Sequence, residues 1–235
     1  MPRLLIVNPN TSDSVTTALA ARARALAPEG STEDDTVAVT ASFGAPYIVD
    51  ETSVAVASHA LLAALAEHTE KARPSAVLVG CFGDPGLLAA RERCNVPVLG
   101  LADAAMREAS ALGTFSIVTG GIAWPPMLRR LAASLGWQDA LVDVVAVEKN
   151  GGELAADPMA ARELLKRACE QALQSGKARS IIVGGAALAG FAEALRAEMP
   201  VPLIDSVDSG IRAAWRAASA QKPGRFDVPE WFTPR

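Results

Sequence analysis

Short apolar runs alternate with longer helical patterns along the chain. Each run is bounded by turn-forming residues and has the length of a strand, while the segments between runs are long enough for helices. Continuous apolar strands separated by helices are typical of parallel sheets that are covered on both faces. The pattern therefore predicts an α/β fold. The expected strands are residues 4–7, 36–40, 76–79, 96–100, 115–118, 142–147, 180–183 and 201–204.

The segments between these strands predict helices with recognisable capping residues at their starts. Thr11 or Ser12 can cap the first helix, and Asp50 or Glu51 most simply caps the second. Asp84 can cap a third helix, because the proline that follows it fits the first helical position. The expected helices are residues 12–27, 52–71, 84 onward, 103–111, 126–135, 158–174 and 207–220, with 148–153 a loop and the tail from 221 laid along the surface.

An internal repeat divides the chain into two related α/β halves. Val79-Gly-Cys-Phe-Gly-Asp-Pro-Gly86 aligns with Val183-Gly-Gly-Ala-Ala-Leu-Ala-Gly190. Val96-Pro-Val-Leu-Gly100 aligns with Val201-Pro-Leu-Ile-Asp205 at nearly the same offset. The repeat predicts two pseudo-symmetric domains, one made of residues 1–98 together with 206–235 and the other of residues 99–205.

A ligand site is expected at the loops that follow the first and third strands of each half. Ligands of open parallel sheets bind beyond the carboxyl ends of the strands. Two facing halves would therefore enclose a cleft between them. Its lining is expected to come from residues 8–12, 80–83, 119–121 and 184–187.

Charge and composition narrow the function to small-molecule chemistry. The net charge is -4, and no run of Lys or Arg could neutralise several phosphates, so a nucleic acid partner is not expected. No apolar stretch reaches the ~20 residues that span a bilayer, and the start of the chain runs directly into a strand, unlike a signal peptide. A cytoplasmic protein without membrane contact is expected. The oligomeric state stays open, with a homo-oligomer as one alternative.

Cysteine usage points to a single candidate thiol and to no metal. The three cysteines are an odd number without metal-ligand spacing, which argues against a disulfide framework and a zinc site. Cys94 and Cys169 fall in helical patterns and are interpreted as packing residues. Cys81 lies between a strand and an expected helix start, where free amides would favour the thiolate, whereas the neighbouring Asp84 carboxylate would disfavour it unless that carboxylate is committed to capping. The alternative is that Cys81 is a small buried apolar residue at a strand end.

The expected binding residues combine side-chain amides, hydroxyls and exposed backbone amides. Asn10 offers donors and an acceptor together, which suits a carboxylate, amide or imide, although a turn and a helix cap explain residues 8–12 equally well. Glycine-rich turns leave backbone amides free to hold a carboxylate or an enolate oxygen. No nucleotide fingerprint occurs, so no phosphate-bearing cofactor is expected. The candidate substrate-binding residues are Asn10, Thr11, Ser12, Tyr47, Phe82, Thr119, Gly120, Gly185 and Ala186.

Five motifs spread over nearly the whole chain occur together in one known family. They are Ile6-Val-Asn-Pro-Asn-Thr-Ser12, Pro46-Tyr-Ile48, Gly80-Cys-Phe-Gly-Asp-Pro-Gly-Leu87, Phe115-Ser-Ile-Val-Thr119 and Val201-Pro-Leu-Ile-Asp205. With them the chain resembles the Asp/Glu/hydantoin racemase superfamily, and within it the hydantoin and allantoin racemase branch. The resemblance implies two pseudo-symmetric α/β domains, no cofactor, and two cysteines that exchange protons on opposite faces of a substrate carbon. It places Cys81 as one of these acid/base groups, and Asn10, Thr119 and Gly120 at the substrate carbonyls.

The chain departs from this family at the second cysteine. Gly185 stands where the family carries it, and Cys169 lies in a helix too far away to replace it. The leading hypothesis is proton transfer by Cys81 at a carbon next to a carbonyl of a small hydantoin-like, amino-acid-like or dicarboxylic substrate. One alternative is a single-cysteine decarboxylase that resembles arylmalonate decarboxylase. The other is a small-acid-binding protein without catalysis.

Overall fold

The computed structural model describes residues 2–232, which fold into two compact units. Of the described residues, 2–101 and 210–232 form the first unit, and Ala102–Ser209 form the second. The chain therefore changes unit inside the helices α4 (Leu101–Ser110) and α9 (Ser206–Ser219). The sequence places these changes slightly earlier, at residues 98/99 and 205/206.

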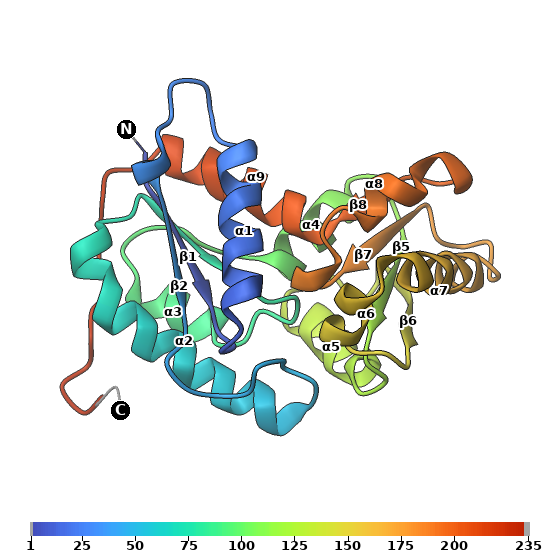
Figure 1. The fold of residues 1–235 in the computed structure, drawn as a ribbon, viewed down its shortest axis with the longest axis horizontal. Coiled ribbons are helices and arrows are strands. Elements are labelled where there is room, and N and C mark those ends of the chain that lie inside the picture. The colour runs from blue at the N-terminus through green and yellow to red at the C-terminus, as the bar shows by residue number, and fades with distance from the viewer. Residues whose placement is uncertain (1, 233–235) are drawn as a thin grey trace. The chain divides into compact units, whose positions relative to one another are not determined.

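Each unit is built on a four-stranded parallel sheet formed by its described residues. The strand order is β2-β1-β3-β4 in the first unit and β6-β5-β7-β8 in the second, so the two sheets have the same topology. The predicted α/β class and the two related halves are thus confirmed (Figure 1). The strands are β1 (Leu4–Asn8), β2 (Thr36–Thr40), β3 (Ala76–Val79), β4 (Val98–Gly100), β5 (Phe115–Gly120), β6 (Leu141–Val147), β7 (Ser180–Gly184) and β8 (Leu203–Asp205).

The central strands are largely apolar because both faces of each sheet are covered. Every residue of β1, β3, β5 and β7 is buried, whereas the edge strands β2 and β6 are largely half-exposed. Helix α1 (Asp13–Ala25) packs on β1 and β2, and α7 (Pro158–Ala172) on β5 and β6 (Figure 1). The other helices are α2 (Glu51–Ala72), α3 (Leu87–Arg93), α5 (Trp124–Ser134), α6 (Gly151–Ala156) and α8 (Phe191–Leu195).

The helices differ from the sequence-based expectation in two ways, the first being short helices that were missed. Residues 148–153 were expected to be a loop, yet α6 begins inside them. The Asn150 side chain accepts from the backbone N–H groups of Gly152 (2.9 Å) and Glu153 (3.1 Å), and the Glu153 carboxylate accepts from the Asn150 N–H (2.8 Å). This reciprocal capping box holds together a helix that is too short to show a periodic pattern. The short helix α8 was missed for the same reason.

The second difference concerns the helix expected to start at Asp84. Helix α3 begins at Leu87, and its N-cap is Gly86 in a left-handed conformation without a side-chain cap. Asp84 lies in the preceding turn with φ +47°, and its backbone carbonyl accepts from the Leu87 N–H at 3.1 Å. Asp50, by contrast, caps α2 as expected, accepting from the Ser53 N–H at 2.8 Å.

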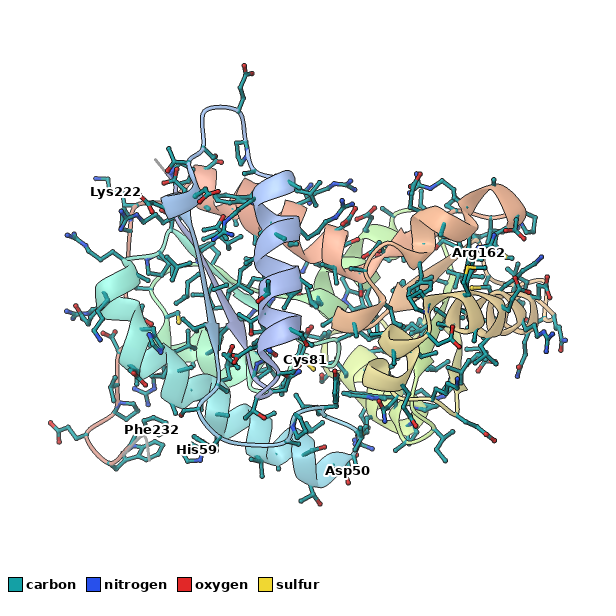
Figure 2. All side chains as sticks on the ribbon, in the orientation of Figure 1. Asp50, His59, Cys81, Arg162, Lys222 and Phe232 are labelled. Atoms are coloured by element: carbon teal, nitrogen blue, oxygen red, sulfur yellow. The ribbon has the colours of Figure 1, made fainter. Side chains whose placement is uncertain are left out.

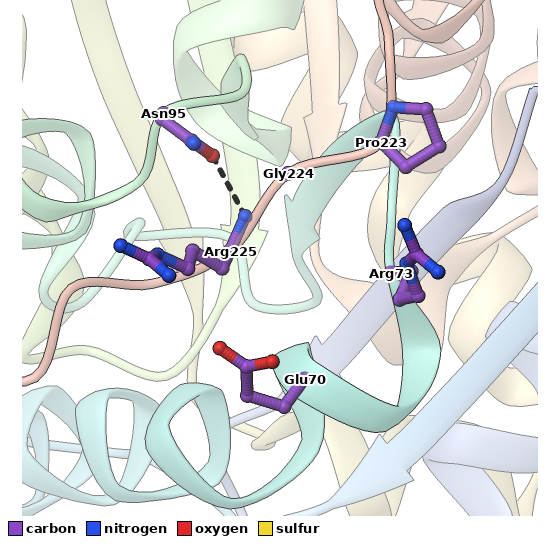
Figure 3. Close-up of a pocket in the computed structure, with 6 residues that line it drawn as sticks. All are labelled: Glu70, Arg73, Asn95, Pro223, Gly224 and Arg225. Atoms are coloured by element: carbon purple, nitrogen blue, oxygen red, sulfur yellow. Dashed lines mark hydrogen bonds between the residues drawn. The ribbon is translucent and has the colours of Figure 1, made fainter.

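The segment after α9 crosses the amino ends of β3 and β4. Phe226 is buried and forms an isolated antiparallel bridge with Cys94, and the Arg225 N–H donates to Asn95 Oδ1 at 2.7 Å (Figure 3). Beside this contact is an open polar pocket, at the end of the sheet opposite to Cys81. Its lining is Glu70, Arg73, Asn95, Pro223, Gly224 and Arg225. Over residues 2–232, no helix is both long and apolar enough to cross a membrane.

Candidate active site

Asn8 organises the loop that follows β1. Its side chain is fully buried, and its Nδ2 group donates to Asn10 Oδ1 (2.8 Å), the Ser12 carbonyl (3.1 Å) and Thr16 Oγ1 (3.0 Å). Its Oδ1 accepts from the Asn10 N–H at 3.2 Å. Sequence reasoning missed this role, although the pair of asparagines around a proline was a visible signal. The network makes the loop rigid at the carboxyl end of a central strand.

The expected binding residues of this loop are held by backbone and side-chain contacts. Asn10 Oδ1 also accepts from the Ser12 N–H at 2.9 Å. Asn10 Nδ2 is a donor group on the same side chain, and it suits a bound carbonyl. The Thr11 N–H donates to the Ala45 carbonyl (3.1 Å), which ties the loop to the segment that carries the half-buried Tyr47. Ser12 occupies the N-cap of α1, but its hydroxyl pairs with Ser14 instead of capping.

Cys81 lies just beyond the carboxyl end of β3, next to the β1 loop (Figure 2). The two strands are neighbours, with Val7 opposite Val79, and the Gly80 N–H donates to the Val7 carbonyl at 2.8 Å. Cys81 is 8% exposed, and Phe82 is buried beside it. The first unit therefore brings the predicted thiol and the Asn10 loop together at one end of its sheet.

Of the two opposing effects expected on the pKa of Cys81, the structure retains the one that disfavours the thiolate. Burial is the main cause that raises the pKa of the Cys81 thiol, and the nearby Asp84 carboxylate raises it further. Helix α3 starts six positions later and has seven residues, so the expected thiolate-stabilising helix start is not next to the sulfur. Cys81 therefore rests as a neutral thiol, which suits a proton donor.

The second unit brings its predicted loops together in the same way. Thr119 and Gly184 are paired across β5 and β7, and the Thr119 hydroxyl donates to the Gly184 carbonyl at 2.7 Å. Gly120 is packed so tightly that an added Cβ would lie 2.7 Å from the Lys149 carbonyl oxygen. Both residues thus have a structural role, because Thr119 joins the two strand ends and Gly120 lets the loop before α6 approach β5.

Gly185 adopts a backbone conformation that side chains rarely tolerate. Its φ is +151°, and a Cβ built on it would lie 3.0 Å from Leu188 Cγ. The Gly185 N–H donates to the buried Ser206 hydroxyl at 3.2 Å, a contact that sequence reasoning missed. Ala186 begins the turn of 3-10 helix that carries the buried Leu188. An apolar side chain thus fills the space next to the position that lacks the second thiol.

The two other cysteines do not lie in these loops. Cys169 is fully buried in the core of the second unit, and Cys94 is half-buried beside the C-terminal segment. Burial is the main cause that raises the pKa of each to about 12. Within residues 2–232, no group of three or more His, Cys, Asp or Glu side chains is placed to hold a metal ion.

We expect the buried Cys169 thiol to make the protein less stable at alkaline pH. Its folded pKa is raised, so above the unfolded value of about 8.5 only the unfolded chain loses this proton, and stability falls by up to about 1.4 kcal/mol per pH unit. The measurement is urea unfolding between neutral and alkaline pH. Cys169→Ala should show a shallower decline than the parent protein, and parallel declines would contradict the expectation.

Comparison with known proteins shows that the chain is similar to racemases in sequence and in fold. Residues 4–214 match the family model described as Asp/Glu/Hydantoin racemase. A hydantoin racemase of Paenarthrobacter aurescens is 33% identical over 213 residues, which cover 90% of this chain and 89% of the relative. An allantoin racemase from Klebsiella pneumoniae superposes with a TM-score of 0.88 at 29% identity, covering 99% and 96% of the two chains. An arylmalonate decarboxylase structure has a TM-score of 0.60 at 17% identity and 95% and 96% coverage, which shows a shared fold alone.

Proposed function

The chain belongs to the Asp/Glu/hydantoin racemase family of enzymes, and we propose that it transfers a proton at a carbon next to a carbonyl, with Cys81 as the acid/base group. The observation that carries this proposal is the placement of Cys81. It is a nearly buried thiol at the carboxyl end of a central strand, beside the rigid Asn10 loop. A structural cysteine would not require a rigid polar loop next to it.

The proposed substrate is a small hydantoin-like, amino-acid-like or dicarboxylic compound. Relatives of the chain are named hydantoin racemase and allantoin racemase, and both names refer to rings that carry carbonyl and N–H groups. Asn10 Nδ2 is able to donate to such a carbonyl, and an amide side chain matches an imide or carboxylate better than a phosphate. Tyr47 and Phe82 would contact the remaining substituent.

The proposed step moves one proton and breaks no other bond. Cys81 donates its S–H proton to the carbon of a bound enolate, leaving a thiolate that recovers a proton from solvent. In the reverse direction the thiolate takes the proton from that carbon, and the negative charge moves to the carbonyl oxygen. Because only a proton is moved, the reaction as written needs no cofactor.

The chain lacks the second cysteine that a two-base racemase would use. A two-base racemase needs an acid on each face, and the position that aligns with Cys81 carries a hydrogen atom in place of a thiol. The neutral resting state of Cys81 favours a second candidate function. In this candidate, loss of carbon dioxide from a malonate-like substrate forms the enolate, and the thiol then protonates it on one side.

A substrate panel in deuterated water distinguishes these functions. The probes are a monosubstituted hydantoin, allantoin, aspartate, glutamate and an arylmalonate. Proton transfer next to a carbonyl predicts deuterium in recovered substrate, whereas decarboxylation predicts deuterium only in the product that has lost carbon dioxide. Tight binding of one probe without label in any compound would contradict the catalytic proposal and support a binding protein.

A further inference from the structure

Both halves of the molecule place a carboxylate between the loop and the neighbouring strand end, but they supply it from different positions, a buried Asp84 in the first and a half-buried Asp205 in the second. The repeat aligns Asp84 in the loop after β3 with Leu188 in the loop after β7. It aligns Gly100 at the end of β4 with Asp205 at the end of β8. Each half thus has one aspartate in this pair of positions and an uncharged residue at the other.

In the first unit the carboxylate reaches from the loop to the strand end. Asp84 is 4% exposed, and its carboxylate fills the space beside Gly100, where an added Cβ would lie 2.1 Å from Oδ2. The turn is closed by the Asp84 N–H, which donates to the Cys81 carbonyl at 3.1 Å. The left-handed backbone of Asp84, at φ +47°, is uncommon outside Gly, Asn and Asp.

In the second unit the carboxylate reaches from the strand end to the loop. Asp205 Oδ2 accepts from the Gly190 N–H (2.7 Å), and Oδ1 accepts from the Val207 N–H (2.9 Å) and the Asp208 N–H (3.3 Å). The apolar Leu188 is buried at the position that corresponds to Asp84. The same link between loop and strand end is therefore made without a charge in the loop.

We propose that Asp84 is a positioning residue for Cys81, which anchors the thiol loop to the end of β4 and keeps the sulfur in its acid form. The proposal rests on the proposed function, in which Cys81 donates a proton. A link between loop and strand end alone does not require a charge at residue 84, because the second unit makes it from Asp205. What the loop carboxylate adds in the first unit is a negative charge in the same turn as the sulfur.

The electrostatics of the turn agree with this assignment. Asp84 is the charged group of the first unit whose field raises the pKa of Cys81, after the larger effect of burial. The neighbouring β1 loop presents the neutral amides of Asn8 and Asn10. Removing the charge at residue 84 should therefore move the titration of the thiol toward lower pH.

The direct test is the pH dependence of Cys81 alkylation in Asp84→Asn. Asparagine keeps the shape and tolerates the left-handed backbone, so the substitution removes chiefly the charge. Iodoacetamide labelling, resolved by peptide mass spectrometry, reports Cys81 separately from the other cysteines. We expect its profile to shift downward by about 1 pH unit. Asp205→Asn is the matched control, with no shift expected at Cys81.

Two results would overturn the proposal: an unchanged Cys81 profile in Asp84→Asn, or an equal shift in Asp205→Asn. Labelling needs no substrate, so this outcome is independent of whether the proposed function holds. Where a substrate is turned over, Asp84→Asn should also move the pH profile of kcat downward. A uniform loss of activity at every pH, without movement of the profile, would indicate a structural role alone.

A second experiment tests the anchor by moving the carboxylate. Gly100→Asp places a side chain on the Asp84 carboxylate and should lower the Tm by about 5 °C. The pair Asp84→Leu with Gly100→Asp reproduces the arrangement of Leu188 and Asp205, and should recover most of that loss. Losses that simply add in the double variant would contradict the anchoring role. The double variant should still show the pH profile of Cys81 alkylation shifted toward lower pH.

Discussion

Cys81→Ala is expected to reduce turnover of the active probe about 10²–10⁴-fold. The substitution removes the group that transfers the proton, and it leaves the Asn8 and Asn10 network of the neighbouring loop in place. Initial rates should fall while substrate affinity changes little, because the binding groups are retained. The measurement is the rate of deuterium incorporation or product formation, with ligand binding followed by calorimetry.

Cys94→Ala is the matched control for this result. Cys94 is a second thiol of the first unit, half-buried where Cys81 is buried, and it lies at the amino end of β4, at the opposite end of the sheet from Cys81. Its removal should leave the rate unchanged. If Cys81→Ala were folded and as active as the parent protein, Cys81 would not be the acid/base group.

Gly185→Cys combined with Leu188→Ala is expected to give the enzyme a second reacting face. Leu188→Ala removes the atoms closest to the new side chain, leaving Leu188 Cβ at 3.6 Å from the built Cβ. The backbone at φ +151° still opposes the substitution at a cost of about 1–3 kcal/mol. Conversion between substrate enantiomers should nevertheless rise at least about 10-fold, since a positioned acid contributes 10²–10⁴-fold. Chiral chromatography of each starting enantiomer measures it.

Two control variants separate the effect of the new thiol from the effects of the enlarged site and of the backbone strain. Leu188→Ala alone enlarges the site without adding an acid, and Gly185→Ala adds the backbone strain without a thiol. Neither should increase the conversion. If the double variant folds and its new cysteine is alkylated, yet no inversion is gained, residue 185 does not face the substrate carbon.

The fold could be predicted from the sequence because its strands are continuous apolar runs. Residues 36–40 and 76–79 were placed at their observed limits, and the repeat identified two sheets that have the same strand order. Short helices were missed, since α6 depends on one capping box and α8 has five residues. The family resemblance carried by the motifs around Asn8 and Cys81 is confirmed by the family match.

The site was less accessible to sequence reasoning than the fold. The position of Cys81 after β3 followed from the strand pattern, but its environment did not. Asp84 followed by proline was interpreted as a helix start, and the structure places it in a left-handed turn with its carboxylate against Gly100. The sequence around Asp84 does not show this contact, because its partner Gly100 lies sixteen positions further along the chain. The catalytic role of Cys81 stays a prediction that its alanine variant tests.

The most direct test of one-sided chemistry is the configuration of the carbon that acquires deuterium. Each enantiomer of the active probe, or the prochiral malonate, is incubated with the enzyme in deuterated water and separated by chiral chromatography with mass detection. Because Cys81 is the one proposed acid/base thiol of the enzyme and position 185 is a glycine, we predict deuterium in a single enantiomer. With Cys81→Ala we predict no deuterium in either. Equal labelling of both enantiomers by the unmodified enzyme would contradict this account.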